Sequence, residues 1–97
     1  MKILREGRTH KVRSWAHLYD AIDIGAKTHD LRKNDRDYRV GDYLTLQRYD
    51  NVLGGYTGEE TTVQITYITG RDHVPCAFSS AVLPPDYVIL SIMKVVT

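Results

Sequence analysis

The chain has 97 residues, 42% of them hydrophobic and 26% charged, with a formal net charge of +1. These values are typical of a globular protein with one hydrophobic core, so we expect a single domain over residues 1–97. No apolar stretch approaches the roughly 20 residues that a membrane-spanning helix needs, and the first residues, MKILREGRTHKVR, lack the apolar run of a signal peptide. The single cysteine, Cys76, cannot form an internal disulfide, which favours a reducing compartment; we expect a cytoplasmic protein.

The two halves of the chain differ in charge. Residues 1–48 contain 11 Lys and Arg against 7 Asp and Glu, a net charge of +4, whereas residues 49–97 contain 2 against 5, a net charge of −3. A basic half beside an acidic half can give a face that attracts phosphate although the whole protein is nearly neutral. Solvated charge with no partner explains the same distribution.

The first quarter of the chain predicts a strand followed by one amphipathic helix. The stretch THKVRSW (9–15) has the alternating, β-branched pattern of a short strand. Ser14 is a candidate N-cap for a helix over about 15–24, whose apolar residues recur at helical spacing: Trp15, Leu18, Tyr19 and Ile22. At that spacing Trp15 is expected to lie in the core rather than to stack on a base. Gly25 stands where helices commonly end in the left-handed conformation.

The remainder of the chain predicts mainly strands. Alternating apolar and polar residues predict strands over residues 27–33, 43–49 and 61–69, and the apolar run YVILSIMKVV predicts a buried central strand over 87–96. Glycines predict a long hairpin connection over 50–60, and Gly70 with the Pro84-Pro85 pair predicts an irregular loop over 70–85. The expected fold is mixed α/β, mainly β: a small barrel or sheet of about five strands with one amphipathic helix packed against it.

A charged segment over residues 27–42, KTHDLRKNDRDYRVGD, contains the strongest candidate site. On a strand, Thr28, Asp30 and Arg32 share one face, so the Asp30 carboxylate can hold the Arg32 guanidinium in a fixed direction. Lys27, at the loose start of the strand, can swing toward the same mouth. Cations for an oxyanion and a carboxylate that accepts from an exocyclic amine suit a nucleobase or phosphate. A surface ion pair worth under about 1 kcal/mol is the simpler explanation, and spacing alone favours it.

The stretch GAKTHDLR (25–32) resembles the G-x-K-x-x-E-x-R signature of ASCH domains in the PUA-like superfamily, with Asp30 in place of the usual glutamate. Together with RKNDRDYRVGDYLTLQRYD, GYTGEE, ITYI and YVILSI, it resembles a compact, phage-associated branch of that group whose function is unassigned. The resemblance covers almost the whole chain. It implies a small PUA-like β-barrel with a cleft, between barrel and helix, that the superfamily uses for RNA or modified nucleotides.

The resemblance also implies an enzymatic alternative. Some ASCH relatives hydrolyse acetylated cytidine with a lysine, a threonine three residues later and a distant glutamate. This chain keeps the lysine as Lys27 but has Asp30 three residues later, and neither Glu59 nor Glu60 can be matched to the glutamate. In a hydrolase of a modified nucleoside or of RNA, Lys27 would activate the nucleophile or stabilise charge, and Asp30 would act as the acid–base group.

Further residues of the charged segment are candidates for nucleic-acid contacts. Arginine and lysine side chains would contact phosphate, and tyrosines would stack on bases: Arg32, Lys33, Arg36, Arg39, Tyr38 and Tyr43. The interleaved acids Asp35, Asp37 and Asp42 weaken any continuous positive stripe, so a tight charged turn in which Asn34 and Asp35 bond their own backbone explains the segment equally well.

The histidines and the cysteine do not form a metal-binding pattern. His73 and Cys76 are three residues apart, but no second pair of ligands accompanies them, so we expect neither metal nor cofactor. His10, with Lys27, is a candidate acid–base group, although a hydrogen-bonded structural histidine is the commoner case. The sequence therefore predicts a module that binds RNA or a modified nucleotide; the alternatives are the small hydrolase and a phage-encoded adaptor or inhibitor that binds a host protein in the host cytoplasm.

Overall fold

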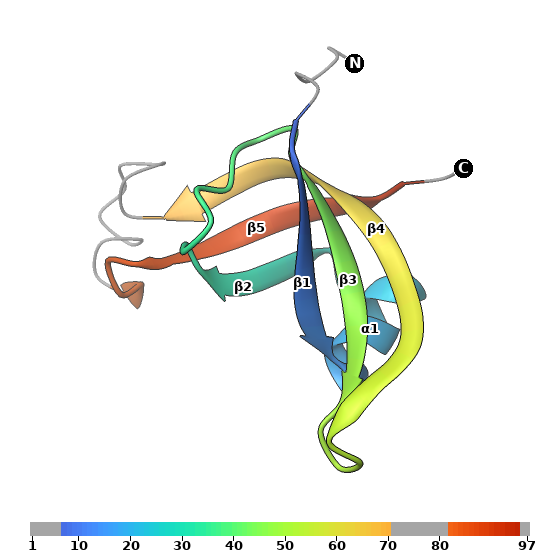
Figure 1. The fold of residues 1–97 in the computed structure, drawn as a ribbon. Coiled ribbons are helices and arrows are strands. Elements are labelled where there is room, and N and C mark those ends of the chain that lie inside the picture. The colour runs from blue at the N-terminus through green and yellow to red at the C-terminus, as the bar shows by residue number, and fades with distance from the viewer. Residues whose placement is uncertain (1–6, 71–81, 96–97) are drawn as a thin grey trace.

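The computed structural model of the chain describes residues 7–70 and 82–95. It contains five strands and one helix in the described part, in the order β1 (Thr9–Trp15), α1 (Ala16–Asp23), β2 (His29–Lys33), β3 (Tyr43–Asp50), β4 (Gly55–Gly70) and β5 (Tyr87–Lys94) (Figure 1). The strands form one sheet in the order β1-β3-β4-β5-β2. The β1–β3 pair is parallel and the other pairs are antiparallel.

The sheet curls into a half-barrel because β4 is long enough to pair with a different strand at each end. Its first part pairs with β3 and its second part with β5. The register shifts between Gln47 and Tyr49 of β3 and between Ile65 and Tyr67 of β4, and such irregularities bend and twist a strand. Figure 1 shows β4 arching over the sheet so that the two ends of the strand order approach one another. The predicted fold, mainly β with about five strands and one packed helix, is confirmed.

The core lies inside this curl. The inward-facing residues of the central strands are fully buried, among them Leu44, Leu46, Val63, Ile65 and Leu90. Helix α1 adds Tyr19 and Ile22 to the same cluster. Burial alternates along β5 as it does along β1, so β5 is not buried on both faces as its apolar sequence predicted. It does have a neighbour on each side, β4 and β2.

The two ends of helix α1 are capped in different ways. Its N-cap is Trp15, which makes no side-chain capping bond, whereas the predicted cap Ser14 is a buried residue of β1. At the other end Gly25 has φ +82°, its N–H donates to the carbonyl of Ile22 at 3.0 Å, and the N–H of Ala26 donates to the carbonyl of Ala21 at 2.9 Å. This is a Schellman motif, and it confirms the predicted role of Gly25.

The structure revises one predicted connection and leaves most of another outside the described residues. The turn between β3 and β4 is shorter than the expected connection over 50–60, because residues 55–60 already belong to β4. Cross-strand pairs with β3, including Tyr49 with Tyr56 and Gln47 with Glu60, hold this glycine-containing stretch extended. Most of the predicted loop over 70–85 lies outside the described residues, as do His73 and Cys76. In the described part, no helix is long and apolar enough to cross a membrane.

Candidate functional site: a pocket between the two edge strands

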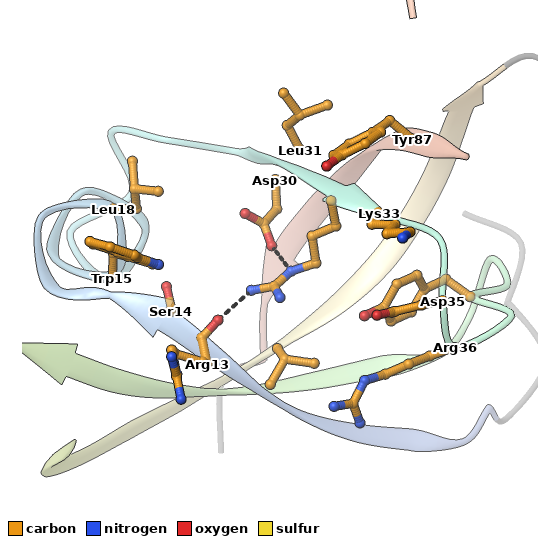
Figure 2. Close-up of a pocket in the computed structure, with 13 residues that line it drawn as sticks. Arg13, Ser14, Trp15, Leu18, Asp30, Leu31, Lys33, Asp35, Arg36 and Tyr87 are labelled. Carbon is orange, nitrogen blue, oxygen red and sulfur yellow. Dashed lines mark hydrogen bonds and ion pairs between the residues drawn. The ribbon is translucent and has the colours of Figure 1, made fainter. Parts of the chain in front are cut away.

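A pocket of about 530 Å³ opens between β1 and β2, the two edges of the half-barrel. Figure 2 shows its lining, which comes from β1, the first turn of α1, β2, the segment after β2, and the first residue of β5. The lining residues are Val12, Arg13, Ser14, Trp15, Leu18, Asp30, Leu31, Arg32, Lys33, Asp35, Arg36, Tyr38 and Tyr87. A volume of this size suits a small molecule or one nucleotide unit.

Arg32 spans the gap between the edge strands. Its Nε donates to Oδ2 of Asp30 on the same strand, and its Nη2 donates to the backbone carbonyl of Arg13 on β1 at 2.9 Å (Figure 2). An edge strand presents carbonyls without a neighbouring strand, and here the guanidinium takes the place of that neighbour. The planar fork of arginine makes both bonds at once and has further N–H groups directed elsewhere.

Asp30 and Arg32 lie on one face of β2, as the two-residue spacing predicted. Their side chains are largely buried, with 7% and 18% of their surfaces exposed. Of the two carboxylate oxygens of Asp30, Oδ2 accepts the bond from Arg32, and Oδ1 accepts none from the described residues. Figure 2 shows the second carboxylate oxygen pointing along the pocket toward Trp15 and Leu18. The pocket therefore offers an acceptor and a donor fork side by side, in a site partly shielded from water.

Trp15 forms one end of the pocket, which corrects its predicted place in the core. The side chain is 45% exposed, and Figure 2 shows the indole nitrogen turned toward the pocket interior. Leu18, one helical turn further on, lies beside it, and Leu31 and Tyr87 form the rim above Asp30. An exposed aromatic ring beside apolar side chains is a surface on which a planar ring can stack.

The opposite end of the pocket is cationic. Lys33 and Arg36 line it together with Asp35, and Figure 2 shows the Arg36 guanidinium at the end away from Trp15. Lys33 also forms an exposed ion pair of 3.7 Å with Asp86. The pocket thus has a polarity: an aromatic end, a buried Asp–Arg pair in the middle, and exposed cations at the other end.

Asp42 holds the segment that carries Arg36. Its carboxylate is fully buried and accepts hydrogen bonds from the backbone N–H of Arg8 and of Arg39, both at 3.1 Å. Its Oδ2 also lies 2.9 Å from Nε2 of His10. His10 is therefore a buried residue whose ring faces Asp42, the hydrogen-bonded arrangement that the sequence analysis gave as the commoner case.

Four of the predicted site residues do not offer an exposed side chain to the pocket: Tyr38, Lys27, Arg39 and Tyr43. Tyr38 lines the pocket but is 1% exposed, and its ring packs edge-on against His10 at 5.0 Å, so it does not offer an open face for a base to stack on. Burial raises the pKa of its phenol. Lys27 donates from Nζ to the carbonyl of His29 at 2.7 Å, Arg39 pairs with Asp37 at 3.1 Å, and Tyr43 lies in β3; these three do not line the pocket.

Sequence reasoning missed several residues that line the pocket, chiefly Trp15, Leu18 and Tyr87. The exposure of Trp15 had a signal, because the exposed series Thr9, Lys11 and Arg13 of β1 continues to position 15 in a two-residue period, but that period does not indicate the pocket. No comparable signal exists for Tyr87, which reaches the pocket only because β5 pairs with β2, with Lys33 opposite Tyr87. In the part of the chain that the structure describes, no three metal-ligating side chains come together.

Comparison with known proteins identifies a family. The model of the family described as "Domain of unknown function (DUF3850)" matches residues 9–92, most of the chain, and the chain belongs to that family. A curated relative, an "Uncharacterized 12.9 kDa protein in GpA 3'region" of Escherichia phage P2, is 36% identical over 62 residues. That match covers 64% of this chain and 55% of the phage protein, so the chain spans about half the length of that relative.

Proposed function

We propose that this member of the DUF3850 family binds RNA or a modified nucleotide in the pocket between β1 and β2. The observation that carries the proposal is the buried Asp30–Arg32 pair, which lies between an exposed Trp15 and the cationic side chains of Lys33 and Arg36. Each of these parts matches one part of a nucleotide.

The central pair suits the edge of a base. A carboxylate oxygen accepts from an exocyclic amine, and the adjacent guanidinium donates to a ring nitrogen or a carbonyl. Because both groups are largely buried, their hydrogen bonds to a ligand would be less weakened by water than bonds at an open surface. The pair therefore favours bases that carry an amine, such as cytosine, over uracil.

The two ends of the pocket suit the remaining parts. A base stacked on Trp15 would gain roughly 1–3 kcal/mol, a gain that does not depend on its sequence. With the base at that end, the sugar would direct its phosphate toward Lys33 and Arg36, where cations hold phosphate without reading sequence. The acids Asp30 and Asp35 limit the net positive charge of the pocket, which reduces unspecific attraction of polyanions.

The proposal includes a superfamily assignment and a cellular location. The GAKTHDLR stretch supports an ASCH, PUA-like assignment, and the strongly curved five-stranded sheet with one helix is compatible with it. The relative in phage P2 supports a phage-associated protein, and the lone cysteine supports action in the host cytoplasm.

The hydrolase alternative has no comparable observation in its favour. Its proposed nucleophile activator, Lys27, bonds the carbonyl of His29 and does not line the pocket that contains Asp30. For an adaptor that binds a host protein, the supporting observation is the turn between β3 and β4, where Val52 and Leu53 are exposed. Two exposed apolar side chains are a less specific feature than the pocket.

The proposal is tested by calorimetric titration with the four nucleoside 5′-monophosphates and the matching nucleosides. We expect saturable binding with a preference for amine-bearing bases. Asp30→Asn places an amide donor where the carboxylate accepts, so it should reduce the preference for cytidine over uridine monophosphate by about tenfold. Arg36→Ala should weaken binding of nucleotides roughly 2- to 5-fold and leave binding of nucleosides unchanged.

Arg39→Ala is the matched control, because Arg39 comes from the same charged segment but lies outside the pocket lining. Equal effects of Arg36→Ala and Arg39→Ala would reject a phosphate position at the Lys33 end. Absence of saturable binding for every nucleotide, by a wild-type protein with a normal circular dichroism spectrum, would contradict the proposed function itself.

A further inference from the structure

A second surface lies on the outer face of the sheet, behind the pocket. On β1 the residues Lys11 and Arg13 point outward and are exposed, on the face opposite to the buried Val12. The Arg13 guanidinium lies over the Tyr49 ring at 4.2 Å from its centroid and 5.7 Å from the Tyr56 centroid. Its Nε donates to the Tyr56 hydroxyl at 3.4 Å.

The two tyrosines form a fixed aromatic platform. Tyr49 of β3 and Tyr56 of β4 are a cross-strand pair, and their rings meet edge to face with centroids 5.1 Å apart. Tyr56 is 55% exposed although it takes part in these contacts. The exposed part of the Tyr56 ring is a surface on which a base can stack, and the contacts with Tyr49 and Arg13 hold that ring in place.

Lys11 and Arg13, the cations of this surface, differ from the nearby Arg48 in their charge partners. Arg48, on the neighbouring strand, is neutralised by a two-fold contact with Asp20 at 2.8 and 3.0 Å and by Glu59 at 3.5 Å. Among the described residues, no carboxylate pairs with Lys11 or Arg13. The Arg13 guanidinium instead contacts Tyr49 and Tyr56, which are neutral. The surface therefore combines two uncompensated cations with exposed aromatic rings, a combination that suits single-stranded nucleic acid.

Arg13 connects this surface with the pocket. Its backbone carbonyl is the acceptor for Arg32 inside the pocket, while its side chain lies on the outer face; Figure 2 shows the side chain directed away from the pocket. Because β1 is an edge strand, no further strand of the sheet separates the two surfaces. A chain of nucleotides can pass over the edge of β1 from one to the other.

We infer that single-stranded nucleic acid with one nucleotide in the pocket continues over β1 onto an outer platform formed by Lys11, Arg13, Tyr49 and Tyr56. The inference rests on the proposed function, because the pocket supplies the first nucleotide. It adds that the natural ligand is an oligonucleotide rather than a free nucleotide. The protein's affinity for the nucleotides next to the one in the pocket would come mostly from stacking and phosphate contacts, which are independent of sequence.

The test compares a nucleoside monophosphate with a fluorescent single-stranded RNA of about 10 nucleotides, a length within the range bound by small single-strand-binding folds. Tyr56→Ala should weaken RNA binding by about fivefold or more and leave binding of the monophosphate unchanged, whereas Tyr56→Phe should keep most of the RNA affinity. Arg13→Ala should reduce the slope of log affinity against log salt by about 1. Trp15→Ala should weaken binding of both ligands.

Tyr67→Ala is the control for Tyr56→Ala, because Tyr67 is a similarly exposed tyrosine of β4 that pairs with β5 rather than with β3. Equal RNA affinities of the Tyr56→Ala and Tyr67→Ala variants would overturn the outer platform, while a loss in Trp15→Ala would leave the pocket proposal standing. Equal losses of monophosphate and RNA binding in Tyr56→Ala would also overturn it, since the platform would then act through the pocket. If Trp15→Ala changes neither affinity, the proposed function fails and the path from the pocket fails with it.

Discussion

Arg32 on β2 donates a hydrogen bond of 2.9 Å to the backbone carbonyl of Arg13 on β1, and these two strands are the unpaired edges of the half-barrel. The same guanidinium is held by the carboxylate of Asp30. One side chain therefore joins the two edges of the sheet and forms the centre of the pocket. Stability and ligand binding are expected to depend on it together.

Arg32→Lys keeps the positive charge but removes the planar guanidinium, so it tests how much the hydrogen-bond geometry of Arg32 contributes to stability. A lysine ammonium cannot bond Asp30 and the distant carbonyl of Arg13 in the way that the planar fork does. We expect a loss of about 1.5–3 kcal/mol in the free energy of unfolding by urea, since hydrogen bonds to charged groups contribute in that range. Arg36→Lys, in the exposed part of the pocket, should change it by less than about 0.5 kcal/mol. Similar losses in the two variants would mean that the bridge contributes no more than a surface charge.

Asp42→Ala should be among the most destabilising single changes in the described chain. It removes the acceptor for two backbone N–H groups and leaves His10 without the carboxylate it contacts, at a position where Asp42 is fully buried. Breaking a buried pair in this way costs about 3–5 kcal/mol. Asp86→Ala, which removes one exposed ion pair with Lys33, should cost less than about 1 kcal/mol. Urea midpoints measure both, and equal midpoints would contradict the structural role of Asp42.

Gly25→Val should cost more stability than Ala26→Val. No atom lies within 4 Å of a Cβ built at Gly25, so a side chain there meets no steric clash with its surroundings. The cost of the substitution comes from the backbone, which has φ +82°. A side chain in the left-handed region costs roughly 1–2 kcal/mol, more for a β-branched residue. Thermal denaturation of the two variants makes the comparison, and equal melting temperatures would show that the Schellman turn rearranges without cost.

The contact between Asp20 and Arg48, which ties α1 to β3, should depend on pH. The hydrogen bond from Arg48 lowers the pKa of Asp20, so the contact adds stability above the unfolded pKa of about 4 and loses it as pH falls through the lower folded pKa. Wild type should therefore be more stable than Asp20→Asn near neutral pH, and the two should converge as the pH falls below the folded pKa of Asp20. Denaturation midpoints across this range measure the difference. A constant difference at all pH values would exclude the Asp20 charge as its source.

Local patterns were sufficient for most of the fold but not for the placement of its aromatic residues. Alternation over 43–49 and 61–69 and the glycine after the helix identified the strands and the helix end, because those signals act over a few residues. Tyr38, in contrast, stands among charged residues and was expected at the surface. It is buried because Asp42 and His10 hold the segment against the half-barrel, and no neighbour in the sequence indicates that contact.

The candidate site was predictable in its centre and not at its ends. The spacing of Asp30 and Arg32 places both on one face of any strand, so their pairing followed from the sequence. The partner of Arg32 on β1 could not be predicted, because it is the backbone carbonyl of Arg13, and every residue type has such a carbonyl. The strand over 55–60 was missed for a related reason: pairing with β3 outweighs the low strand propensity of Gly55, Gly58 and the two glutamates.

The central claim, a nucleotide in the pocket, has a built-in reporter. The chain contains one tryptophan, Trp15, and it lines the pocket, so intrinsic fluorescence excited at the red edge of its absorption reports occupancy directly. Titration with cytidine monophosphate should quench the emission saturably, and Asp30→Ala, with Trp15 still in place, should shift the midpoint by about tenfold or more. Emission that stays constant, or falls linearly and identically in both proteins, would contradict the account.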